Sequence, residues 1–279
     1  MRVHRLARYP VKALQGEAVA SAEVDRHGVT SDRRYAVQDV ESGLVASLKN
    51  PRRWSALLTV SARAHDDGSV GLRGPDAVVS SRDVERASAH LSRWCGRPVR
   101  LVEARQLDAP VIERLWPEVE GLVPDDVLAQ AKQSSPAGWP VSANGLPGGD
   151  SFVDSGRVHL ISAATLRHLD LTPADGLHRF RPNVVVAGAP RPYNEDAWVG
   201  KVLRIGSVVL KVDIPTPRCI VPTLAHDSAP ERPEILRVLA AEHRVLIPEF
   251  GTYTCAGVYA DVVAPGVIRQ GDDVHVSEC

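Results

Sequence analysis

Cysteine is scarce in this sequence and net charge is almost absent, and each shortage excludes a kind of site or partner. Only four cysteines occur in 279 residues, and no two of them form a C-x-x-C pair. This spacing argues against a zinc knuckle, a local iron–sulfur motif and a disulfide framework. The formal net charge of −1 gives no electrostatic reason to expect nucleic acid or an anionic membrane as a partner.

Long apolar segments are also missing. No apolar run approaches the roughly 18–20 residues that a membrane span needs, and the first residues lead into no apolar segment of a signal peptide. Hydrophobic residues make up 44% and charged residues 24%, which is ordinary for a soluble globular protein. The sequence therefore predicts a cytoplasmic protein, in a reducing compartment, with one large or two ordinary domains.

Short strand-like runs separated by turn residues dominate the chain, for example at residues 57–62 and 184–188. Helical patterns are few, the clearest being residues 84–95, which end at Gly96. The strands do not alternate regularly with helices, which disfavours a doubly wound sheet. The pattern favours a β-rich α+β fold that contains a β-barrel.

The best candidate for a long interdomain loop or lid is residues 134–150, which hold several prolines and glycines. We place the domain boundary within residues 110–150 and divide the chain into residues 1–120 and 121–279. Near the carboxyl end, residues 268–276 resemble the terminal hairpin of a barrel.

The stretch from Pro215 to Cys219 is the first candidate for chemistry. It follows a strand-like run, and Pro215 and Pro217 are expected to stop that strand and to stiffen the loop. Arg218 is a fixed positive charge beside Cys219 that favours the thiolate, which is the form that a soft metal centre needs. The alternative is that Cys219 is a small buried apolar residue.

Cationic and capping residues outside this loop are candidates for binding an anion. Arg181 directly precedes an apolar strand, where its planar guanidinium can hold a carboxylate or phosphate. Arg33 and Arg34 point to opposite faces of a strand, so that one can face a pocket and the other solvent. The alternative is that Asp32 pairs with one of them on the surface. Ser162 fits the N-cap of a short helix, either as a cap alone or as part of an anion site. Lys12 stands on a loop, and its alternative is an ordinary surface lysine. The alternative for Arg181 is a structural ion pair.

Six short motifs then occur in the order of a known family. They are Tyr9-Pro10-Val11-Lys12, Asp32-Arg33-Arg34-Tyr35, Phe180-Arg181-Pro182-Asn183, Glu195-Asp196-Ala197-Trp198, Arg218-Cys219, and Phe250-Gly251-Thr252-Tyr253 through Gly271-Asp272. The chain resembles a MOSC-domain protein with a smaller N-terminal β-barrel domain. This molybdenum-cofactor family includes the amidoxime-reducing component and the C-terminal domain of molybdenum cofactor sulfurase.

The resemblance implies that Cys219 is the protein ligand of molybdenum. It also implies a cofactor-binding set for the phosphate and polar edges of the pterin, made of Lys12, Arg33, Ser162, Arg181, Asn183 and Arg218. The chain departs from the family at Ala13, where relatives often have Ser, and at Pro217, where a reductase relative has Ser. Residues 222–227 also differ from the family's Thr-Thr-x-Asp pattern.

The function implied by the resemblance is an oxidoreductase that reduces small N-hydroxylated compounds. His226 and Asp227 are the candidates for a general acid. The chain ends without a ferredoxin domain, so a separate ferredoxin, flavodoxin or cytochrome-type donor would supply the electrons. One alternative is a carrier of sulfur or of the cofactor, with a persulfide on Cys219. Another is a barrel that has lost its cofactor. No lysine motif indicates that pyridoxal phosphate, which serves a separate domain of the sulfurases, binds here.

Overall fold

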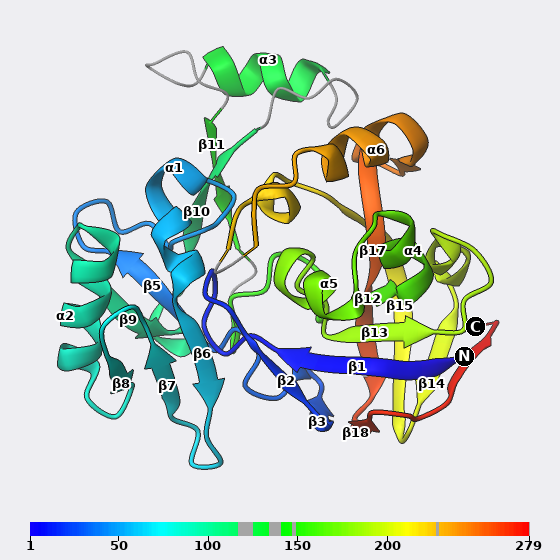
Figure 1. The fold of residues 1–279 in the computed structure, drawn as a ribbon, viewed down its shortest axis with the longest axis horizontal. Coiled ribbons are helices and arrows are strands. Elements are labelled where there is room, and N and C mark those ends of the chain that lie inside the picture. Colours follow the sequence, from blue (N-terminus) through cyan, green and yellow to red (C-terminus); the bar gives the residue numbers. More distant parts are fainter. Residues whose placement is uncertain (117–124, 134–140, 147–148, 227–228, 279) are drawn as a thin grey trace.

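The computed structural model describes residues 1–116, 125–133, 141–146, 149–226 and 229–278. A group of short strands around helix α2 (Val84–Cys95) lies on one side of the molecule, and one large sheet lies on the other (Figure 1). The two termini lie near each other, on the side of the large sheet.

The large sheet joins strands from both ends of the chain. In the described residues it contains nine strands, and its main path runs β19 (Val274–Ser277), β14 (Val202–Ile205), β15 (Val208–Pro217), β17 (Gly251–Ala264), β12 (Val158–Ser162), β13 (Val184–Ala187), β1 (Arg2–Arg8), β2 (Glu17–Val19). A ninth strand, β16 (Arg244–Ile247), pairs with β17. β12 and β13 are parallel, whereas β1 is antiparallel to β13, with Leu6 opposite Val184.

Four smaller groups of strands complete the β-structure. They are β18 (Gly266–Arg269) with β3 (Ser21–Asp25) and β4 (Gly28–Val29); β5 (Tyr35–Asp39) with β9 (Val99–Glu103); β6 (Ser61–Ala64) with β7 (Val70–Arg73) and β8 (Val78–Ser80); and β10 (Val111–Leu115) with β11 (Val141–Gly145). The strands are short and tied together by turns, as the sequence predicts. The β-rich α+β fold class is confirmed.

The helices are short and few. The α-helices of the described residues are α1 (Pro51–Trp54), α2, α3 (Asp125–Gln133), α4 (Ala163–His168), α5 (Pro173–Arg179) and α6 (Glu234–Glu242). The 3-10 helices are η1 (Ser55–Thr59), η2 (Ala104–Gln106), η3 (Asn194–Trp198) and η4 (Val221–Thr223). α2 is capped by the Asp83 side chain, which accepts the Arg86 N–H, and it ends at Gly96 with φ 64°. This left-handed residue is the C-terminal stop that the sequence predicts.

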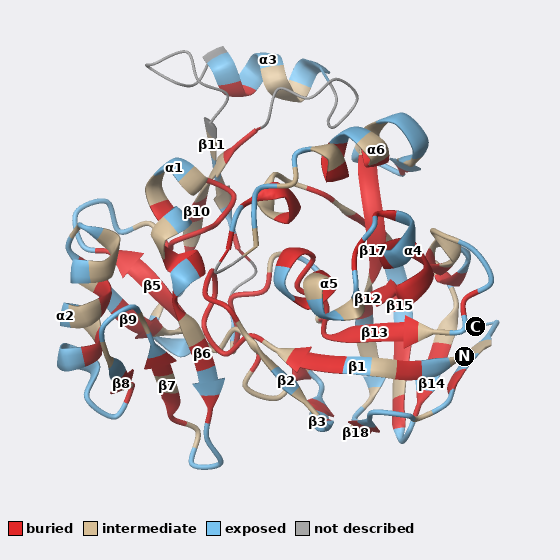
Figure 2. Cartoon of the chain, in the orientation of Figure 1, coloured by how far each residue is buried: buried red, intermediate tan, exposed pale blue. Residues whose placement is uncertain are grey.

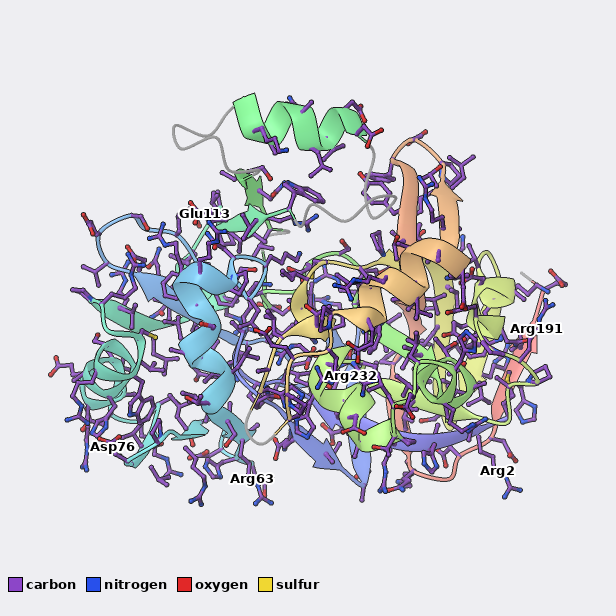
Figure 3. The ribbon with its side chains drawn as sticks, turned by 45° about the horizontal axis from the view of Figure 1, so that its top comes forward. Arg2, Arg63, Asp76, Glu113, Arg191 and Arg232 are labelled. Atoms are coloured by element: carbon purple, nitrogen blue, oxygen red, sulfur yellow. The ribbon has the colours of Figure 1, made fainter. Side chains whose placement is uncertain are left out.

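The apolar residues gather in the interior of each half of the molecule. Buried residues fill the strands of the large sheet and the space between α2 and its neighbouring strands (Figure 2). Charged side chains such as Arg2, Arg63, Asp76 and Arg191 lie at the periphery (Figure 3). None of the described helices combines the length and the apolar character needed to span a bilayer. The fold is thus held by ordinary burial of apolar side chains.

Three expectations about local structure are wrong. Residues 57–62 were expected to form one strand, but η1 occupies the first part and β6 begins only at Ser61. Residues 268–276 do not form a hairpin, because β18 pairs with β3 and β19 pairs with β14. Part of the expected loop at residues 134–150 forms β11, paired with β10, while residues 134–140 and 147–148 lie outside the described residues. In the second and third cases the pairing involves strands that are well separated in sequence.

The prolines do not stop β15, contrary to expectation. β15 continues to Pro217, with Pro215 opposite Val258 and Pro217 opposite Cys255. Its other neighbour, β14, pairs only as far as Lys211. Beyond that point no described strand pairs with β15 on the second side, so the sheet needs no N–H from the prolines there, and the register shifts beside them.

The division of the chain at residue 120 stays a prediction, and that residue lies outside the described ones. Strand pairing crosses the proposed division, because β1 and β2 belong to the same sheet as β12 and β13. A division by residue number therefore separates strands that pair with each other.

Candidate functional site

A cavity of about 600 Å³ lies where loops from both halves of the chain meet. Its wall includes the loop after β1, the turn before β5, the residues before β13 and the loop after β15. Six residues of the predicted site line it: Lys12, Arg33, Arg181, Asn183, Arg218 and Cys219. Segments that are remote in sequence thus bring most of the predicted site together.

Cys219 lies on the cavity wall directly after β15, and it is partly exposed. The backbone beside it is fixed, because the Arg218 N–H donates to the Thr254 carbonyl at 2.9 Å. The Arg218 guanidinium donates to the Phe180 carbonyl at 3.2 Å and lies over the Phe180 ring. The loop thus presents one sulfur atom to the cavity beside a buried cation.

The Arg218 side chain has hydrogen-bonding capacity that the described residues leave unused. Its Nε is buried and has no hydrogen-bond partner among them. The same is true of the Oγ1 of Thr216. Burial lowers the pKa of Arg218, although an arginine stays charged at neutral pH. Because a buried polar atom without a partner is costly, the Arg218 Nε indicates a place for a polar ligand, whereas Thr216 does not line the cavity.

Arg33 and Arg181 form a second cationic group of the wall. Both have positive φ, 51° and 55°, so each stands at a sharp turn of the backbone. Their guanidinium groups lie over the Tyr9 ring, at 4.9 Å and 4.4 Å from its centroid. Arg33 forms an ion pair with Asp32, and Arg181 donates to the Leu14 carbonyl at 2.6 Å. Burial and the neighbouring Arg33 lower the pKa of Arg181 to about 10, so it remains charged at neutral pH.

The choice between the two adjacent arginines falls on Arg33. Arg34 pairs with Glu103 at 2.7 Å and does not line the cavity. Asp32 is buried, and its carboxylate also accepts the Tyr9 N–H at 2.7 Å. The pairing of Asp32 with an arginine is therefore a buried contact that supports the cavity wall, and not a surface contact.

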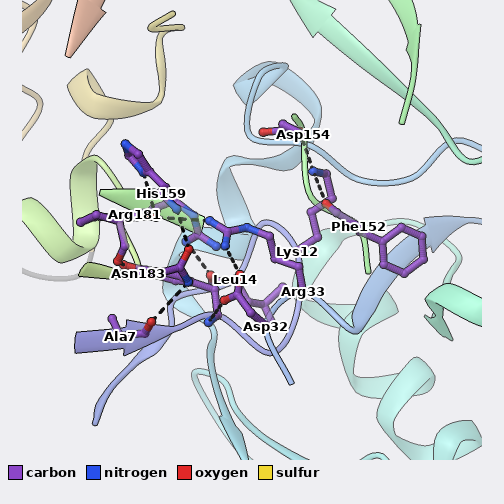
Figure 4. A network of polar contacts seen from close by, with 12 residues as sticks. Ala7, Lys12, Leu14, Asp32, Arg33, Phe152, Asp154, His159, Arg181 and Asn183 are labelled. Atoms are coloured by element: carbon purple, nitrogen blue, oxygen red, sulfur yellow. Dashed lines mark hydrogen bonds and ion pairs between the residues drawn. The ribbon is translucent and has the colours of Figure 1, made fainter. Parts of the chain in front are cut away.

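Lys12 is buried and lines the cavity with a second lysine that the sequence analysis missed. The Lys12 ammonium donates to the Phe152 carbonyl at 2.9 Å and to Asp154 at 2.7 Å (Figure 4). Lys49 lies 3.0 Å from the same oxygen of Asp154. Burial alone would raise the pKa of Asp154, but Lys12 and Lys49 outweigh it and hold that pKa well below its usual range. One carboxylate therefore serves two ammonium groups, which leaves an excess of positive charge.

Asn183 and His159 form the most buried polar part of the wall. The Asn183 side chain accepts the His159 N–H at 3.1 Å and donates to the Ala7 carbonyl at 3.4 Å (Figure 4). Burial and the neighbouring Arg218 hold the pKa of His159 well below its usual value, so the ring is neutral. The Asn183 amide thus ties β12 to β1, and this shapes the cavity.

Ser162 lies apart from the cavity wall. It is fully buried, and its hydroxyl accepts the Thr165 N–H at 3.0 Å at the start of α4. The Ser162 N–H donates to Glu195 at 3.3 Å, and the same carboxylate accepts the Thr165 hydroxyl at 2.8 Å. This geometry supports the capping alternative.

Of the two candidates for a general acid, only His226 lies within the described residues, and it does not line the cavity. His226 is buried, stacks on His178 with ring centroids 5.2 Å apart, and is not among the lining residues. Asp227 lies outside the described residues. We therefore assign no proton transfer to this pair.

The sequence analysis missed several lining residues, and they share one property. Lys49, Asp154, His159, Arg114 and Trp116 all face the cavity, but none belongs to the motifs that pointed to the site. Most of them stand on loops or at the ends of short strands, where no periodic pattern marks a buried position.

Taken together, the cavity wall is cationic. Its cationic side chains are Lys12, Arg33, Lys49, Arg114, Arg179, Arg181 and Arg218, against the carboxylates of Asp154, Asp213 and Asp261. Such a wall favours an anionic ligand. No group of three or more His, Cys, Asp or Glu side chains is placed to hold a metal ion in the described part of the chain. A metal in this cavity would therefore depend on one protein ligand together with its own cofactor.

Two family models match the chain. The model of the MOSC domain matches residues 148–275, and the model of the MOSC N-terminal beta barrel domain matches residues 1–97. The candidate residues divide between the two matches, since Lys12 and Arg33 fall in the second and Arg181 and Cys219 in the first.

Relatives named mitochondrial amidoxime reducing component 2 are similar to the chain. The Bos taurus protein is 24% identical over 292 residues, which covers 96% of this chain and 80% of the relative. The Rattus norvegicus protein is 33% identical over 132 residues, covering 45% of this chain and 38% of the relative. The crystal structure of the YuaD protein from Bacillus subtilis is similar with a TM-score of 0.46 and 12% identity, covering 100% of this chain and 96% of that one.

The relatives are named as mitochondrial proteins, and the cytoplasmic location of this chain stays a prediction. The family assignment does not depend on these relatives, because the two family models together match most of the sequence. The chain belongs to the MOSC family and carries the MOSC N-terminal beta barrel domain in front of its MOSC domain.

Proposed function

We propose that the protein binds a molybdenum cofactor in the cationic cavity and reduces N-hydroxylated compounds with electrons from a separate donor protein. The observation that carries this proposal is the single partly exposed thiol, Cys219, on a wall whose charged groups are mostly cations. The relatives named amidoxime reducing component support the choice of reaction.

The residues present fit such a group. Cys219 offers a soft sulfur ligand for the metal. Lys12, Arg33, Arg181 and Arg218 offer cationic donors for a phosphate and for the polar edges of a pterin. The buried Arg218 Nε, which has no partner among the described residues, would gain one in such a ligand.

Two members of the predicted set have other roles in this proposal. Asn183 shapes the floor of the cavity, because its amide is engaged with the backbone of His159 and Ala7. Ser162 is not included, because its hydroxyl caps α4 outside the cavity.

When bound, the molybdenum cofactor would supply the two-electron redox chemistry of the reaction. Reduction of an N-hydroxylated compound breaks the N–O bond, takes up two electrons and two protons, and releases water and the N–H product. A reduced ferredoxin, flavodoxin or cytochrome-type protein would supply the electrons. The contribution of this chain is to hold the cofactor on cationic side chains and to place Cys219 at the metal.

The second candidate function is a carrier that holds sulfur on Cys219 as a persulfide. The partial exposure of this thiol beside the Arg218 charge favours it, since both features suit a reactive sulfur. Delivery of that sulfur to a cofactor as sulfide takes up two electrons, which a second thiol supplies by forming a disulfide with Cys219, so that no reduced donor protein is consumed. The two candidates therefore differ in whether a reduced donor is consumed.

The test is reduction of benzamidoxime by protein purified from a host that makes the cofactor, with reduced methyl viologen as the donor and benzamidine as the measured product. We expect turnover by the unaltered protein and by Cys95→Ala, since Cys95 ends α2 away from the cavity. Turnover should be lost in Cys219→Ala. Two results together would favour the carrier over the reductase. They are the absence of turnover and an additional sulfur atom on Cys219, detected by mass spectrometry after loading with a sulfur donor.

A further inference from the structure

The cavity has an aromatic side that the proposed cofactor set does not use. Arg114 and Trp116, at the end of β10, line it together with Tyr253 and Phe250, from the tip of the β16–β17 hairpin. Phe250 is 65% exposed, whereas Trp116 is 9% exposed and Lys12 is 5% exposed. Phe250 therefore marks the open end of this side, and Trp116 is buried.

Arg114 is directed into the cavity by the alternation of its strand. Its neighbour Glu113 points to the other side of β10, where its carboxylate accepts from Asn50 at 2.5 Å and pairs with Arg53 at 3.4 Å. Arg114 itself has no carboxylate partner among the described residues. Burial raises the pKa of Tyr253, and the charge of Arg114 opposes this rise. The charge of Arg114 therefore acts on the aromatic side of the cavity.

The arrangement of Arg114 leaves its donors available for a ligand. The guanidinium lies over the Trp116 ring, 4.5 Å from its centroid. Stacking occupies the face of a guanidinium, whereas its N–H donors lie in the plane and match the two oxygens of a carboxylate. The Arg114 Nε is buried and lacks a hydrogen-bond partner among the described residues. Trp116 is held in turn, because its indole N–H donates to the Ser142 hydroxyl at 2.9 Å.

Lys49 adds a second cation toward this side. It shares the single carboxylate of Asp154 with Lys12, so that the charge of one of the two lysines is not neutralised. The charges of Arg114 and Lys49 act on each other, because Arg114 contributes to the lowered pKa of Lys49. An anion placed between them would relieve this repulsion.

We propose that the substrate of this protein carries a carboxylate on an aromatic or apolar body, with Arg114 and Lys49 binding the carboxylate and Trp116 and Tyr253 packing against the body. The inference rests on the proposed function, because it names the class of N-hydroxylated compound that is reduced. It assigns Arg114 to the substrate, and not to the cofactor.

The test compares benzamidoxime with its 4-carboxy derivative, using reduced methyl viologen as the donor and the cofactor-loaded protein. A charge-assisted hydrogen bond contributes roughly 1.5–3 kcal/mol. We therefore expect kcat/KM to favour the carboxylate by about tenfold or more in the unaltered protein. Arg114→Gln should lose this preference, so that the ratio of the two kcat/KM values falls to about one. The matched control is Arg204→Gln, which removes an exposed arginine on β14 that does not line the cavity.

A second readout does not depend on turnover. Titration calorimetry measures the binding of 4-amidinobenzoate, and of benzamidine as the reference that lacks the carboxylate, to the same proteins. Binding of 4-amidinobenzoate should weaken about tenfold in Arg114→Gln and less in Arg114→Lys, which keeps the charge but loses the planar fork. Thermal unfolding checks that each variant folds.

The outcomes separate this inference from the proposed function. If both compounds are reduced without a charge preference, the inference is wrong while the reductase proposal stands. If neither is reduced but 4-amidinobenzoate binds through Arg114, the carboxylate site stands and the reductase proposal fails. Loss of molybdenum and pterin from Arg114→Gln would also overturn the inference, since it would assign Arg114 to the cofactor.

Discussion

Arg179 is the side chain whose removal tests most sharply how the loop after Cys219 is held. It is 3% exposed, and its guanidinium donates to the carbonyls of Pro222 and Leu224, at 3.1 Å each, and of Pro230 at 2.7 Å. These bonds anchor the backbone that follows Cys219, the proposed metal ligand. The substitution Arg179→Met keeps much of the length of the side chain and removes all hydrogen-bond donors of the guanidinium.

The magnitude follows from the bonds that are lost. Hydrogen bonds to a charged group contribute roughly 1.5–3 kcal/mol each, but removing a buried charge also returns its desolvation cost. Burial and the nearby Arg232 lower the pKa of Arg179, which shows that this cost is present. We therefore expect the free energy of unfolding to fall by about 2–4 kcal/mol, and the three carbonyls to become accessible to water.

The assay combines urea unfolding with hydrogen exchange. In Arg179→Met, exchange should accelerate in residues 220–232 and change little in the strands of the large sheet. The matched control is Arg167→Met, because Arg167 is exposed on α4. Its free energy of unfolding should change by less than about 0.5 kcal/mol. Equal stability of the two variants, with unchanged exchange after Cys219, would refute the role given to Arg179.

Two further predictions concern the cavity wall, and a third concerns a glycine of β17. Asp154→Asn leaves Lys12 and Lys49 buried without a counter-charge, and should cost about 3 kcal/mol at neutral pH by urea unfolding. Because the folded pKa of Asp154 is depressed, this difference should shrink as the pH falls below about 4; an equal loss at every pH would contradict it. Binding of 4-amidinobenzoate should weaken as the pH rises through about 8, where Lys49 loses its proton, and a pH-independent affinity by calorimetry would contradict that. Gly257→Ala should cost about 2 kcal/mol or more, because φ is +79° and the new Cβ would lie 2.6 Å from the Leu160 carbonyl oxygen. Gly43→Ala, at φ +71° with open space around it, should cost only about 1 kcal/mol in the same thermal or urea unfolding assay.

Much of the cavity could be predicted from the sequence because short motifs mark it. Arg181 precedes an apolar strand and Cys219 follows one, so strand ends bring both to one place. The spacing between Pro10 and Lys12 likewise marks a loop beside a strand. Such local signals do not depend on which strands pair, which is why the placement of these residues could be anticipated.

What could not be predicted depends on long-range pairing. The continuation of β15 through Pro215 follows from the short length of β14, which leaves one side of β15 without a partner strand. Lys49 and Asp154 meet across more than a hundred residues of sequence, and neither has a neighbour that announces the contact. Ser162 carries the signal of a helix cap, and this signal does not reveal whether the hydroxyl also reaches a cavity.

The most direct test of the central claim is the molybdenum and pterin content of the protein, measured by elemental analysis and pterin fluorescence. The unaltered protein and Cys219→Ala are compared after purification from a host that makes the cofactor. The account predicts near-stoichiometric molybdenum and pterin in the unaltered protein, and loss or weakening of molybdenum in Cys219→Ala. An unaltered protein without molybdenum or pterin, under conditions where a known molybdoenzyme fills, would contradict it.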